Sequence, residues 1–284
     1  MIKEDIEEFL YFYNIHDIEY RKKCYNCYEA MIRDKNIKNK FYSIKKMLIK
    51  NKNSEIEKIW KIKHINELFE KEVPPFITNL LLLSNCKEHK ENMKKYGFKE
   101  EQINIHKIRV RECLTKDIYN RGYDGIRVSQ MLWGMYFINC KLIEVGRLQY
   151  EYCNKNDYKF IKIHIPLGEK LLYKKVIDSL EHSKDEIKKY FKLENNEYYC
   201  ESWLLSNEIK NILDKNSNIY KFRELFEVKD GKNANEDILN FVYGLQNIKN
   251  LKELPENTSL QRNIKELLLK EKDIYIGIGK LKTI

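Results

Sequence analysis

Hydrophobic residues recur at helical spacing through the first 122 residues of the chain. Apolar side chains three and four positions apart lie on one face of an α-helix. Such faces are formed by Ile6, Phe9, Leu10 and Tyr13; by Tyr25, Tyr28, Met31 and Ile32; and by Phe41, Ile44 and Leu48. A further helix is expected to begin at Pro74-Pro75 and to end at Gly97, and another covers residues 103–118. We expect these faces to pack together in an all-helical domain over residues 1–122.

The run Arg121-Gly122-Tyr123-Asp124-Gly125 is rich in turn residues and predicts a domain boundary. Beyond it, helical spacing alternates with the two-residue period of β-strands. We expect strands over residues 146–152, 158–165, 198–205, 238–243 and 274–281, and helices over 128–142, 166–180, 183–191, 206–213, 217–226 and 258–270. The helices at 183 and 258 begin with the capping boxes Ser183-Lys184-Asp185-Glu186 and Thr258-Ser259-Leu260-Gln261. Residues 123–284 are therefore predicted to form a mixed α/β domain with five to seven strands, which makes the fold class α+β.

The strands at 146–152 and 158–165 are expected to pair as a β-hairpin around Asn154-Lys155-Asn156-Asp157. Alternation along both strands places apolar side chains on one face and polar side chains on the other. The apolar face carries Leu148, Tyr150, Tyr152, Ile161, Ile163 and Ile165. If Asn154 pairs with Asp157, the polar face places Arg147 opposite His164 and Gln149 opposite Lys162, with Glu151 one step along.

The polar face of this hairpin has two interpretations. Antiparallel sheets often have one face in water, and cross-strand charge pairs are common there. A buried glutamate beside a histidine is, however, a natural general-base pair. We expect Arg147, Gln149, Glu151 and His164 to be turned into a covered cleft, because an unpaired charge on a covered face would cost several kcal/mol.

The second strand of the hairpin runs into the sequence Ile165-Pro166-Leu167-Gly168-Glu169-Lys170 and then into a helix. A glycine between a strand and a helix lets backbone N–H groups at the helix N-terminus approach a phosphate. The sequence has neither the P-loop nor the dinucleotide-binding pattern, both of which contain more glycines.

Composition and charge narrow the possible partners. The net charge of the 284 residues is +10, but only nine of the 53 basic residues are Arg, the side chain that grips phosphates and base edges with a planar fork. We therefore interpret the lysines as a solubilising surface and expect no nucleic-acid partner. No apolar run approaches the ~20 residues that span a bilayer, and the N-terminus lacks an apolar signal core. The sequence predicts a cytoplasmic protein that does not bind membranes.

The cysteines and histidines give no metal or disulfide pattern. Seven cysteines are irregularly spaced, and no second pair accompanies Cys24-Tyr25-Asn26-Cys27 at zinc-site spacing. We expect ordinary core cysteines and no metal.

Five motifs in order along residues 122–284 resemble a bacterial family of acyltransferases. They are Gly146-Arg147-Leu148-Gln149-Tyr150-Glu151, Ile163-His164-Ile165-Pro166-Leu167-Gly168, Cys200-Glu201-Ser202-Trp203-Leu204-Leu205, Ser217-Asn218-Ile219 with Phe222, and Leu254-Pro255-Glu256-Asn257-Thr258-Ser259-Leu260-Gln261-Arg262. That family joins a helical N-terminal domain to a GNAT-like C-terminal domain. The resemblance extends more weakly to Val73-Pro74-Pro75-Phe76.

The resemblance implies a coenzyme A thioester as acyl donor and an amine as acceptor. Residues 160–166 would be the strand that pairs with the pantetheine arm, and residues 167–171 the loop that cradles the pyrophosphate. The cofactor-binding residues would be Ile163, Ile165, Leu167, Gly168, Glu169, Lys170 and Asn218. Glu151, His164 and Tyr220 would be the catalytic groups, with Glu151 as the base, directly or through water.

Four residues are candidates for binding the acceptor: Arg147, Gln149, Trp203 and Arg262. Trp203 lies on an expected strand, where it also fits as a core residue. Arg262 lies in the first turn of a helix, where the helix dipole disfavours a cation, so an anionic partner is expected.

The function predicted from the sequence is acyl transfer from acyl-CoA or acetyl-CoA to the amine of a small molecule or peptide. The alternative is a non-catalytic GNAT-like binding or regulatory module that has lost its cofactor loop. The single glycine and the acidic Glu169 favour the alternative, whereas the polar hairpin face favours the enzyme. The sequence does not identify the amine, the acyl chain length or the oligomeric state.

Overall fold

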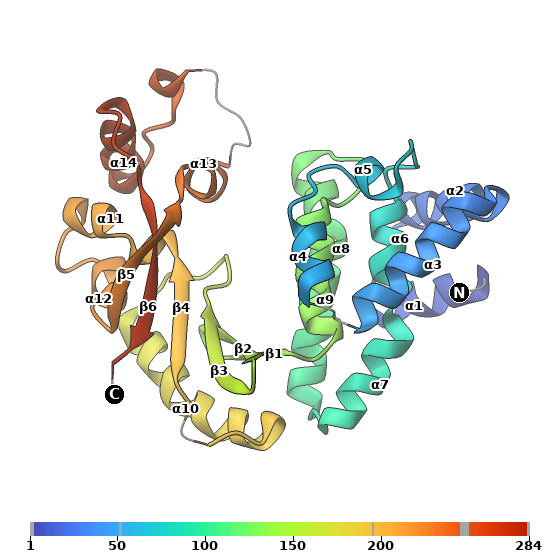
Figure 1. Ribbon diagram of the computed structural model, residues 1–284, viewed down its shortest axis with the longest axis horizontal. Helices are drawn as coiled ribbons and strands as arrows, with labels where there is room; N and C mark the ends of the chain where they lie inside the picture. Colours follow the sequence, from blue (N-terminus) through green and yellow to red (C-terminus); the bar gives the residue numbers. More distant parts are fainter. Residues whose placement is uncertain (1–2, 51–52, 195, 245–249, 283–284) are drawn as a thin grey trace. The chain divides into compact units, whose positions relative to one another are not determined.

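The computed structural model describes residues 3–50, 53–194, 196–244 and 250–282 of the chain (Figure 1). The chain forms two compact units, Met1–Ile143 and Glu144–Ile284, which are considered separately. The division falls about twenty residues after the turn cluster at 121–125. None of the described helices is long and apolar enough to cross a membrane.

The first unit is built from helices up to Ile138, as the spacing of its hydrophobic residues predicts. Its helices are α1 (Lys3–Phe12), α2 (Ile18–Arg33), α3 (Lys35–Lys50), α4 (Asn53–Trp60), α5 (Ile65–Phe69), α6 (Ile77–Leu83), α7 (Cys86–Tyr96), α8 (Glu100–Arg121) and α9 (Val128–Ile138). Every residue of α6 is buried, so this short apolar helix runs through the core. Its one amide, Asn79, donates to the Leu114 carbonyl and accepts from the Ile126 backbone N–H, which satisfies its polar atoms inside the core.

Two expectations for this unit differ from the structure. The helix expected from Pro74 to Gly97 is divided into α6 and α7, because Ser84 and Asn85 both donate side-chain hydrogen bonds to the Leu81 carbonyl and compete with the helical ladder. The helix expected over 128–142 ends at Ile138, and Leu142 begins a strand. α9 packs against α8 and α6, which places it in the helical unit.

The second unit is built on a six-stranded sheet with the order β1-β2-β3-β4-β6-β5. The strands are β1 (Leu142–Val145), β2 (Leu148–Lys155), β3 (Tyr158–His164), β4 (Tyr198–Ser202), β5 (Phe226–Asn233) and β6 (Tyr275–Leu281). The helices are α10 (Tyr173–Phe191), α11 (Asn207–Ile212), α12 (Asn218–Arg223), α13 (Asn235–Tyr243) and α14 (Ser259–Leu269). β3 and β4 are parallel and are joined through α10, whereas β4–β6 and β5–β6 are antiparallel. The predicted mixed α/β fold is confirmed.

The hairpin of β2 and β3 is confirmed, but its register differs by two positions. Lys155 pairs with Tyr158, so that Gln149 lies opposite His164 and Glu151 lies opposite Lys162. The two-residue loop is Asn156-Asp157, both at positive φ, as a type I′ turn requires. The expected loop would have placed Lys155 in this conformation, which Asn and Asp adopt more readily. A shift of two leaves every side chain on its predicted face.

The apolar face of the hairpin packs against α10. Leu148, Tyr150, Ile161 and Ile163 are fully buried. Tyr150 forms a hydrogen bond of 2.8 Å with Ser179 of α10, and the rings of Tyr152 and Phe191 are stacked. The hairpin is thus fixed on one face by the helix that follows it.

Several element boundaries in this unit were predicted wrongly. α10 is one helix, because Ser183 is buried on its packed face and donates to the Leu180 carbonyl instead of capping a new helix. The strand expected over 198–205 ends at Ser202, and Trp203–Leu205 is a 3-10 turn. The run 238–243 belongs to α13, since Ile238 and Tyr243 share a buried helical face. β1 and β5 were not expected as strands, and Phe226 starts β5 instead of ending a helix.

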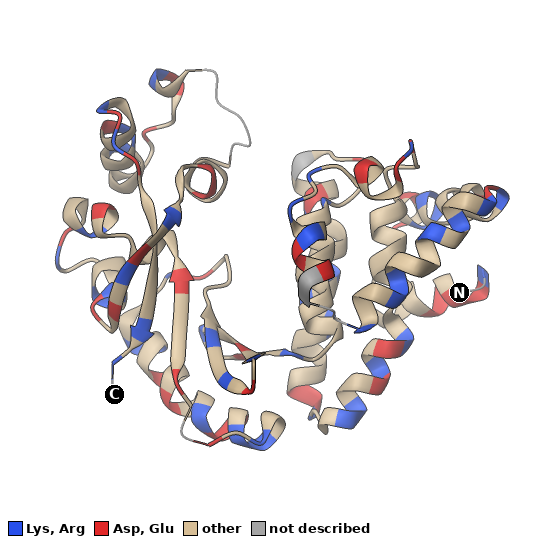
Figure 2. Cartoon of the chain, viewed as in Figure 1, with Lys and Arg blue, Asp and Glu red and all other residues tan. Residues whose placement is uncertain are grey.

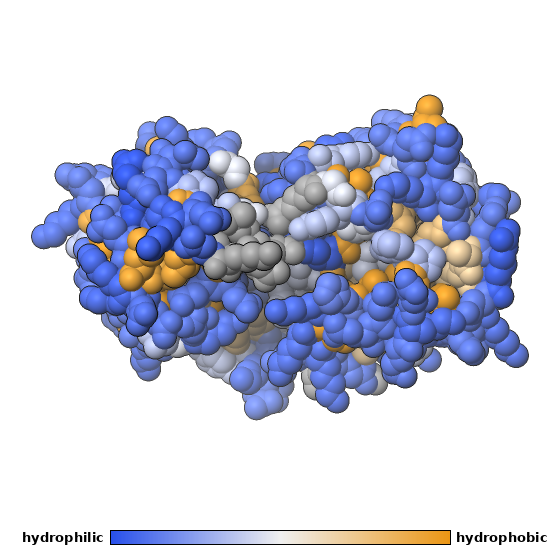
Figure 3. Space-filling view, turned by 90° about the horizontal axis from the view of Figure 1, so that it is seen from above, coloured by the Kyte–Doolittle hydropathy of each residue, from blue (hydrophilic) through white to orange (hydrophobic). Residues whose placement is uncertain are grey.

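The surface carries both signs of charge. Basic and acidic residues are interspersed along the elements of both units (Figure 2). Many of them pair, as do Lys45 with Glu88 and Lys265 with Glu256. The view in Figure 3 shows a largely hydrophilic surface with small groups of hydrophobic side chains.

Candidate active site on the β2–β3 hairpin

The side chains of Glu151 and His164 lie within ion-pair distance of each other on the polar face of the hairpin. The Nε2 of His164 lies 2.7 Å from Oε2 of Glu151, across the diagonal between neighbouring strands. The two side chains are only 12% and 18% exposed. A carboxylate at this distance orients the imidazole and forms with it the kind of pair that serves as a general base. The pair can therefore accept a proton from a bound group.

The polar side chains around this pair form two further hydrogen-bonded pairs, of which the Lys162–Glu201 pair is exposed. Gln149 donates a hydrogen bond of 2.6 Å to Glu144 of β1 and is 2% exposed. Lys162 donates a hydrogen bond of 2.8 Å to Glu201 of β4. Burial acts to raise the pKa of Glu201, but the bond from Lys162 and the positive charges of Lys162 and Lys232 outweigh it, so that the pKa is lowered. Glu201 is thus held ionised beside the pair.

Arg147 was expected to bind substrate, but its guanidinium holds the loop that follows β3. Its Nη1, Nη2 and Nε donate hydrogen bonds of 3.0, 2.7 and 3.3 Å to the carbonyl oxygens of Pro166, Glu169 and Lys170. The side chain is buried, at 8% exposure. Three donors of one planar fork therefore bind three carbonyls of a single loop.

The loop at 165–172 contains most of the expected cofactor-binding residues. Gly168 has a φ of +123°, a region that side chains rarely adopt. Leu167 is exposed, and Ile163 is buried towards α10, so that only the backbone of Ile163 can face a ligand. The carboxylate of Glu169 is 2.5 Å from Nζ of Lys175, which neutralises the acid locally and lowers its pKa.

The start of α10 lacks the groups that usually satisfy a helix N-terminus. Its N-cap residue, Leu172, has no side chain that can accept a hydrogen bond, and the first turn contains no acid. Lys174 and Lys175 lie there instead, where the helix dipole disfavours cations unless an anion is bound. None of the described residues accepts a hydrogen bond from the backbone N–H groups of residues 167–171.

Four of the expected site residues are not joined to this group by the hydrogen bonds and ion pairs of the described residues. The ring of Tyr220 lies 5.5 Å from Nζ of Lys210, and Asn218 is the first residue of α12. Trp203 packs beside the small core of α11, α13 and α14. Arg262 donates to the carbonyl of Glu256 in the loop before its own helix, which explains a cation at that position.

Comparison with known proteins identifies the second unit. Residues 142–281 match the family described as the GNAT-like C-terminal domain. The second unit has a GNAT-like fold. The matched residues include the parallel β3–β4 pair and the loop with Gly168.

Two solved structures with this fold are acyltransferases. One is an acyltransferase in complex with decanoyl-CoA, with a TM-score of 0.66 and 20% identity over 74% of this chain and 66% of that chain. The other is an acyltransferase in complex with CoA and 10C-teicoplanin, with a TM-score of 0.65 and 22% identity over 73% of this chain and 66% of that one. At these identities the likeness shows a shared fold. No curated protein matches the chain in sequence.

Two acids of the GNAT-like domain that complete the polar face, Glu144 and Glu201, are not predicted by the alternation of the hairpin strands. Glu144 lies on β1, a strand of only four residues, and the helical run before it concealed that strand. Glu201 was seen only as part of a motif, because the parallel pairing that brings β4 beside β3 is not visible in sequence. The signal that could have found Glu201 is the Tyr-Tyr-Cys-Glu-Ser alternation, which places it on the face opposite Cys200.

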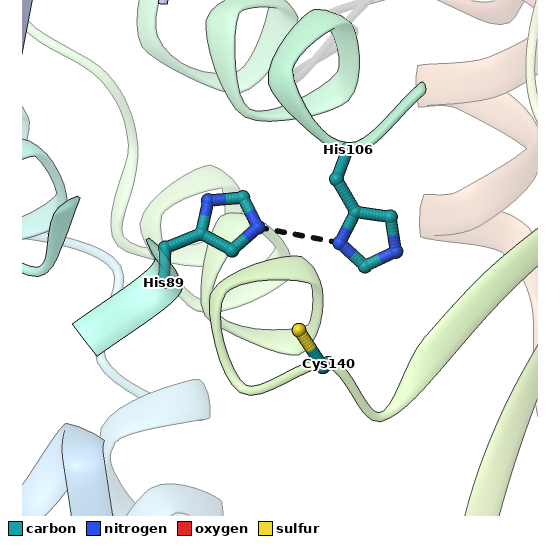
Figure 4. Close-up of side chains that lie close together, drawn as sticks. All are labelled: His89, His106 and Cys140. Carbon is teal, nitrogen blue, oxygen red and sulfur yellow. Dashed lines mark hydrogen bonds between the residues drawn. The ribbon is translucent and has the colours of Figure 1, made fainter. Parts of the chain in front are cut away.

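A second cluster of titratable groups lies in the core of the helical unit (Figure 4). His89 and His106 are fully buried, with 3.3 Å between Nε2 of His89 and Nδ1 of His106. The Tyr13 hydroxyl lies 2.9 Å from Nδ1 of His89, and the Phe137 carbonyl 3.1 Å from Nδ1 of His106. The Cys140 sulfur points towards the space between the rings, and the three potential ligand atoms lie within 4.8 Å of one another.

These contacts form a chain of hydrogen bonds that spans the helices of the core. The chain occupies both nitrogens of His89 and the Nδ1 of His106. Burial lowers the pKa of both histidines, to about 4 for His106, so the rings are neutral. Neutral imidazoles could also ligate a metal, and the absence of a metal stays a prediction.

Proposed function

We propose that the protein is a cytoplasmic bacterial N-acyltransferase that moves an acyl group from a CoA thioester to an amine. The GNAT-like domain and the acyltransferase folds that it resembles support acyl transfer. The observation that carries the proposal is the half-buried Glu151–His164 pair, at the end of the strand that leads into the glycine-containing loop.

The donor site lies where β3 and β4 cease to pair. The parallel pairing covers residues 161–163 and 198–200, although β3 continues to His164 and β4 to Ser202. Backbone groups beyond this point are available to the amide groups of a pantetheine arm. The free N–H groups of residues 167–171 and the lysines of the first turn of α10 would bind the pyrophosphate.

The chemistry needs one proton acceptor at the amine. The amine nitrogen attacks the thioester carbonyl carbon, the Glu151–His164 pair takes the proton from that nitrogen, and the C–S bond breaks. The CoA thiolate takes up the proton that the pair releases, and the products are an amide and CoA. A backbone N–H group near the end of β3 would stabilise the oxyanion.

The acceptor is an amine of a small molecule or peptide. Two of the solved acyltransferases with this fold were crystallised with teicoplanin or a derivative of it. The polar groups of the hairpin face suit an acceptor with hydrogen-bonding groups beside the amine. The roles of Tyr220, Asn218, Trp203 and Arg262 remain predictions.

Glu151→Gln tests the proposal, because glutamine keeps the hydrogen bond from His164 but cannot hold a negative charge. We expect the affinity for decanoyl-CoA to stay within about twofold and turnover to fall roughly 10²–10⁴-fold. Turnover is measured as release of the CoA thiol with teicoplanin and simple primary amines as acceptors.

Glu197→Gln is the matched control, since Glu197 accepts from Tyr199 at 2.6 Å in a separate cluster and its change should lower stability without affecting turnover. Binding of decanoyl-CoA by the unaltered protein without thiol release from any acceptor would favour the non-catalytic module instead.

A further inference from the structure

Arg147 is distinguished by what its charge binds. The guanidinium of Arg147 donates hydrogen bonds to the backbone carbonyls of residues 166, 169 and 170. Glu169 contributes its carbonyl to Arg147, while its carboxylate is turned to Lys175. The guanidinium thus acts on the shape of the loop through its backbone.

The direction of these carbonyls fixes the direction of the neighbouring N–H groups. In a trans peptide the C=O of one residue and the N–H of the next point in opposite directions. Binding of the carbonyls of 166, 169 and 170 by Arg147 therefore turns the N–H groups of Leu167, Lys170 and Leu171 away from the guanidinium. These are among the N–H groups for which no described residue is an acceptor.

We propose that Arg147 is a positioning residue that holds the loop 166–171 in the form that presents its N–H groups to the pyrophosphate of the acyl-CoA donor. This inference rests on the proposed function and adds the residue that organises the donor site. Gly146, at a φ of +56°, lies in the tight turn between β1 and β2, next to Arg147. This turn places the Arg147 side chain within hydrogen-bond distance of the loop. A lysine at 147 would keep the charge but could not bind three carbonyls with one planar group.

The test compares two donors on Arg147→Lys. Decanoyl-CoA contains the pyrophosphate, whereas S-decanoyl-pantetheine has the same acyl group and arm without it. We expect calorimetry to show a loss of roughly 10–100-fold in affinity for decanoyl-CoA, the size of effect seen when a residue that orients ligating groups is lost. The affinity for S-decanoyl-pantetheine should stay within about twofold.

The comparison of two donors on one preparation separates positioning from stability, because misfolded protein reduces the apparent binding of both. Arg127→Lys is the control: Arg127 of the helical unit forms a bidentate ion pair with Asp117, and its change should lower stability and leave both affinities unchanged. An equal loss for both donors, or no loss for either, would overturn the inference.

A measurement on the unaltered protein covers the case in which Arg147→Lys does not fold. CoA should slow hydrogen exchange at the amides of Leu167, Lys170 and Leu171, and exchange unaffected by saturating CoA would overturn the inference. If the unaltered protein binds neither donor, the proposed function itself fails. That outcome differs from equal affinity for the two donors, which would mean that the arm is bound and the pyrophosphate is not.

Discussion

Gly168 combines two properties that a loop around an anion requires. Its φ of +123° is accessible almost only to glycine, and a Cβ placed there would meet no atom within 4 Å. The cost of a side chain at this position therefore comes from backbone strain, about 1–3 kcal/mol, and not from crowding within the protein.

We expect Gly168→Ala to shift the loop and to weaken CoA binding severalfold, as measured by calorimetry. Gly244→Ala is the control, because Gly244 also has a positive φ (+71°) with open space around it, but lies at the end of α13. Its strain should lower the melting temperature without changing CoA affinity. Equal CoA affinity in all three proteins would exclude the loop as the pyrophosphate site.

At the scale of single residues, alternation predicts which side chains share a face. It correctly places Gln149, Glu151 and His164 together, and the two-position error in register does not change the face. The role of Arg147 could not be predicted, because its partners are carbonyls 19 to 23 residues away and carry no side-chain signal. Chemistry that uses the backbone is the part of a site that residue types do not reveal.

Among the helices and strands, the capping box of α14 is the local signal that the structure reproduces in full. Thr258 accepts from the Gln261 backbone N–H, and the Gln261 side chain accepts from the Thr258 N–H, both at 3.1 Å. Gln261 also donates to the Val242 carbonyl of α13, which ties the two helices together.

We expect Thr258→Ala to lower the free energy of unfolding of the GNAT-like domain by about 1 kcal/mol, measured by urea denaturation. Thr258→Ser keeps the hydroxyl and should unfold at nearly the same urea concentration as the unaltered protein. A Thr258→Ala protein as stable as the unaltered one would mean that the cap contributes nothing.

The same type of motif at Ser183 predicted a helix start that does not exist. The buried face of α10 runs without a break through Val176, Leu180, Ser183 and Ile187, so tertiary packing prevails over a local signal. The run 238–243 failed for a related reason. Its β-branched and aromatic residues favour a strand, but Ile238, Leu239 and Val242 pack on one face of a helix.

Across the whole molecule, sequence periodicity distinguishes the helical first part from the α/β second part, but it does not fix where they meet. The turn cluster at 121–125 is only a loop between two helices of the first unit, because α9 packs into that unit's core. Non-local pairings, such as β3 with β4, decide the sheet order and appear only in the structure. β5 was missed because an edge strand with Lys229, Asp230 and Lys232 lacks the apolar alternation of a covered strand.

The buried histidines make the stability of the helical unit depend on pH. The pKa of His106 is lowered to about 4 by burial, and that of His89 is lowered well below its usual value by burial and by His106. In the unfolded chain both titrate near pH 6.5, at about the usual value for histidine. Burial raises the pKa of the facing Tyr13 and Cys140, so both stay neutral over this range.

The unfolded state therefore binds more protons than the folded state once the pH falls below about 6.5. The free energy of unfolding of the helical unit keeps its full value above that pH. It decreases as the pH falls towards 4, by about 3 kcal/mol for His106 alone. Hydrogen exchange at the amides of α7 and α8 should show this loss between pH 7 and pH 5, above the range in which ordinary carboxylates titrate. His106→Asn should flatten the dependence, whereas His64→Asn, at an exposed position of the same unit, should leave it unchanged. If the stability of the His106→Asn protein falls as steeply with decreasing pH, other groups determine the acid stability. Protonation of His106 in the folded core would then cost nothing.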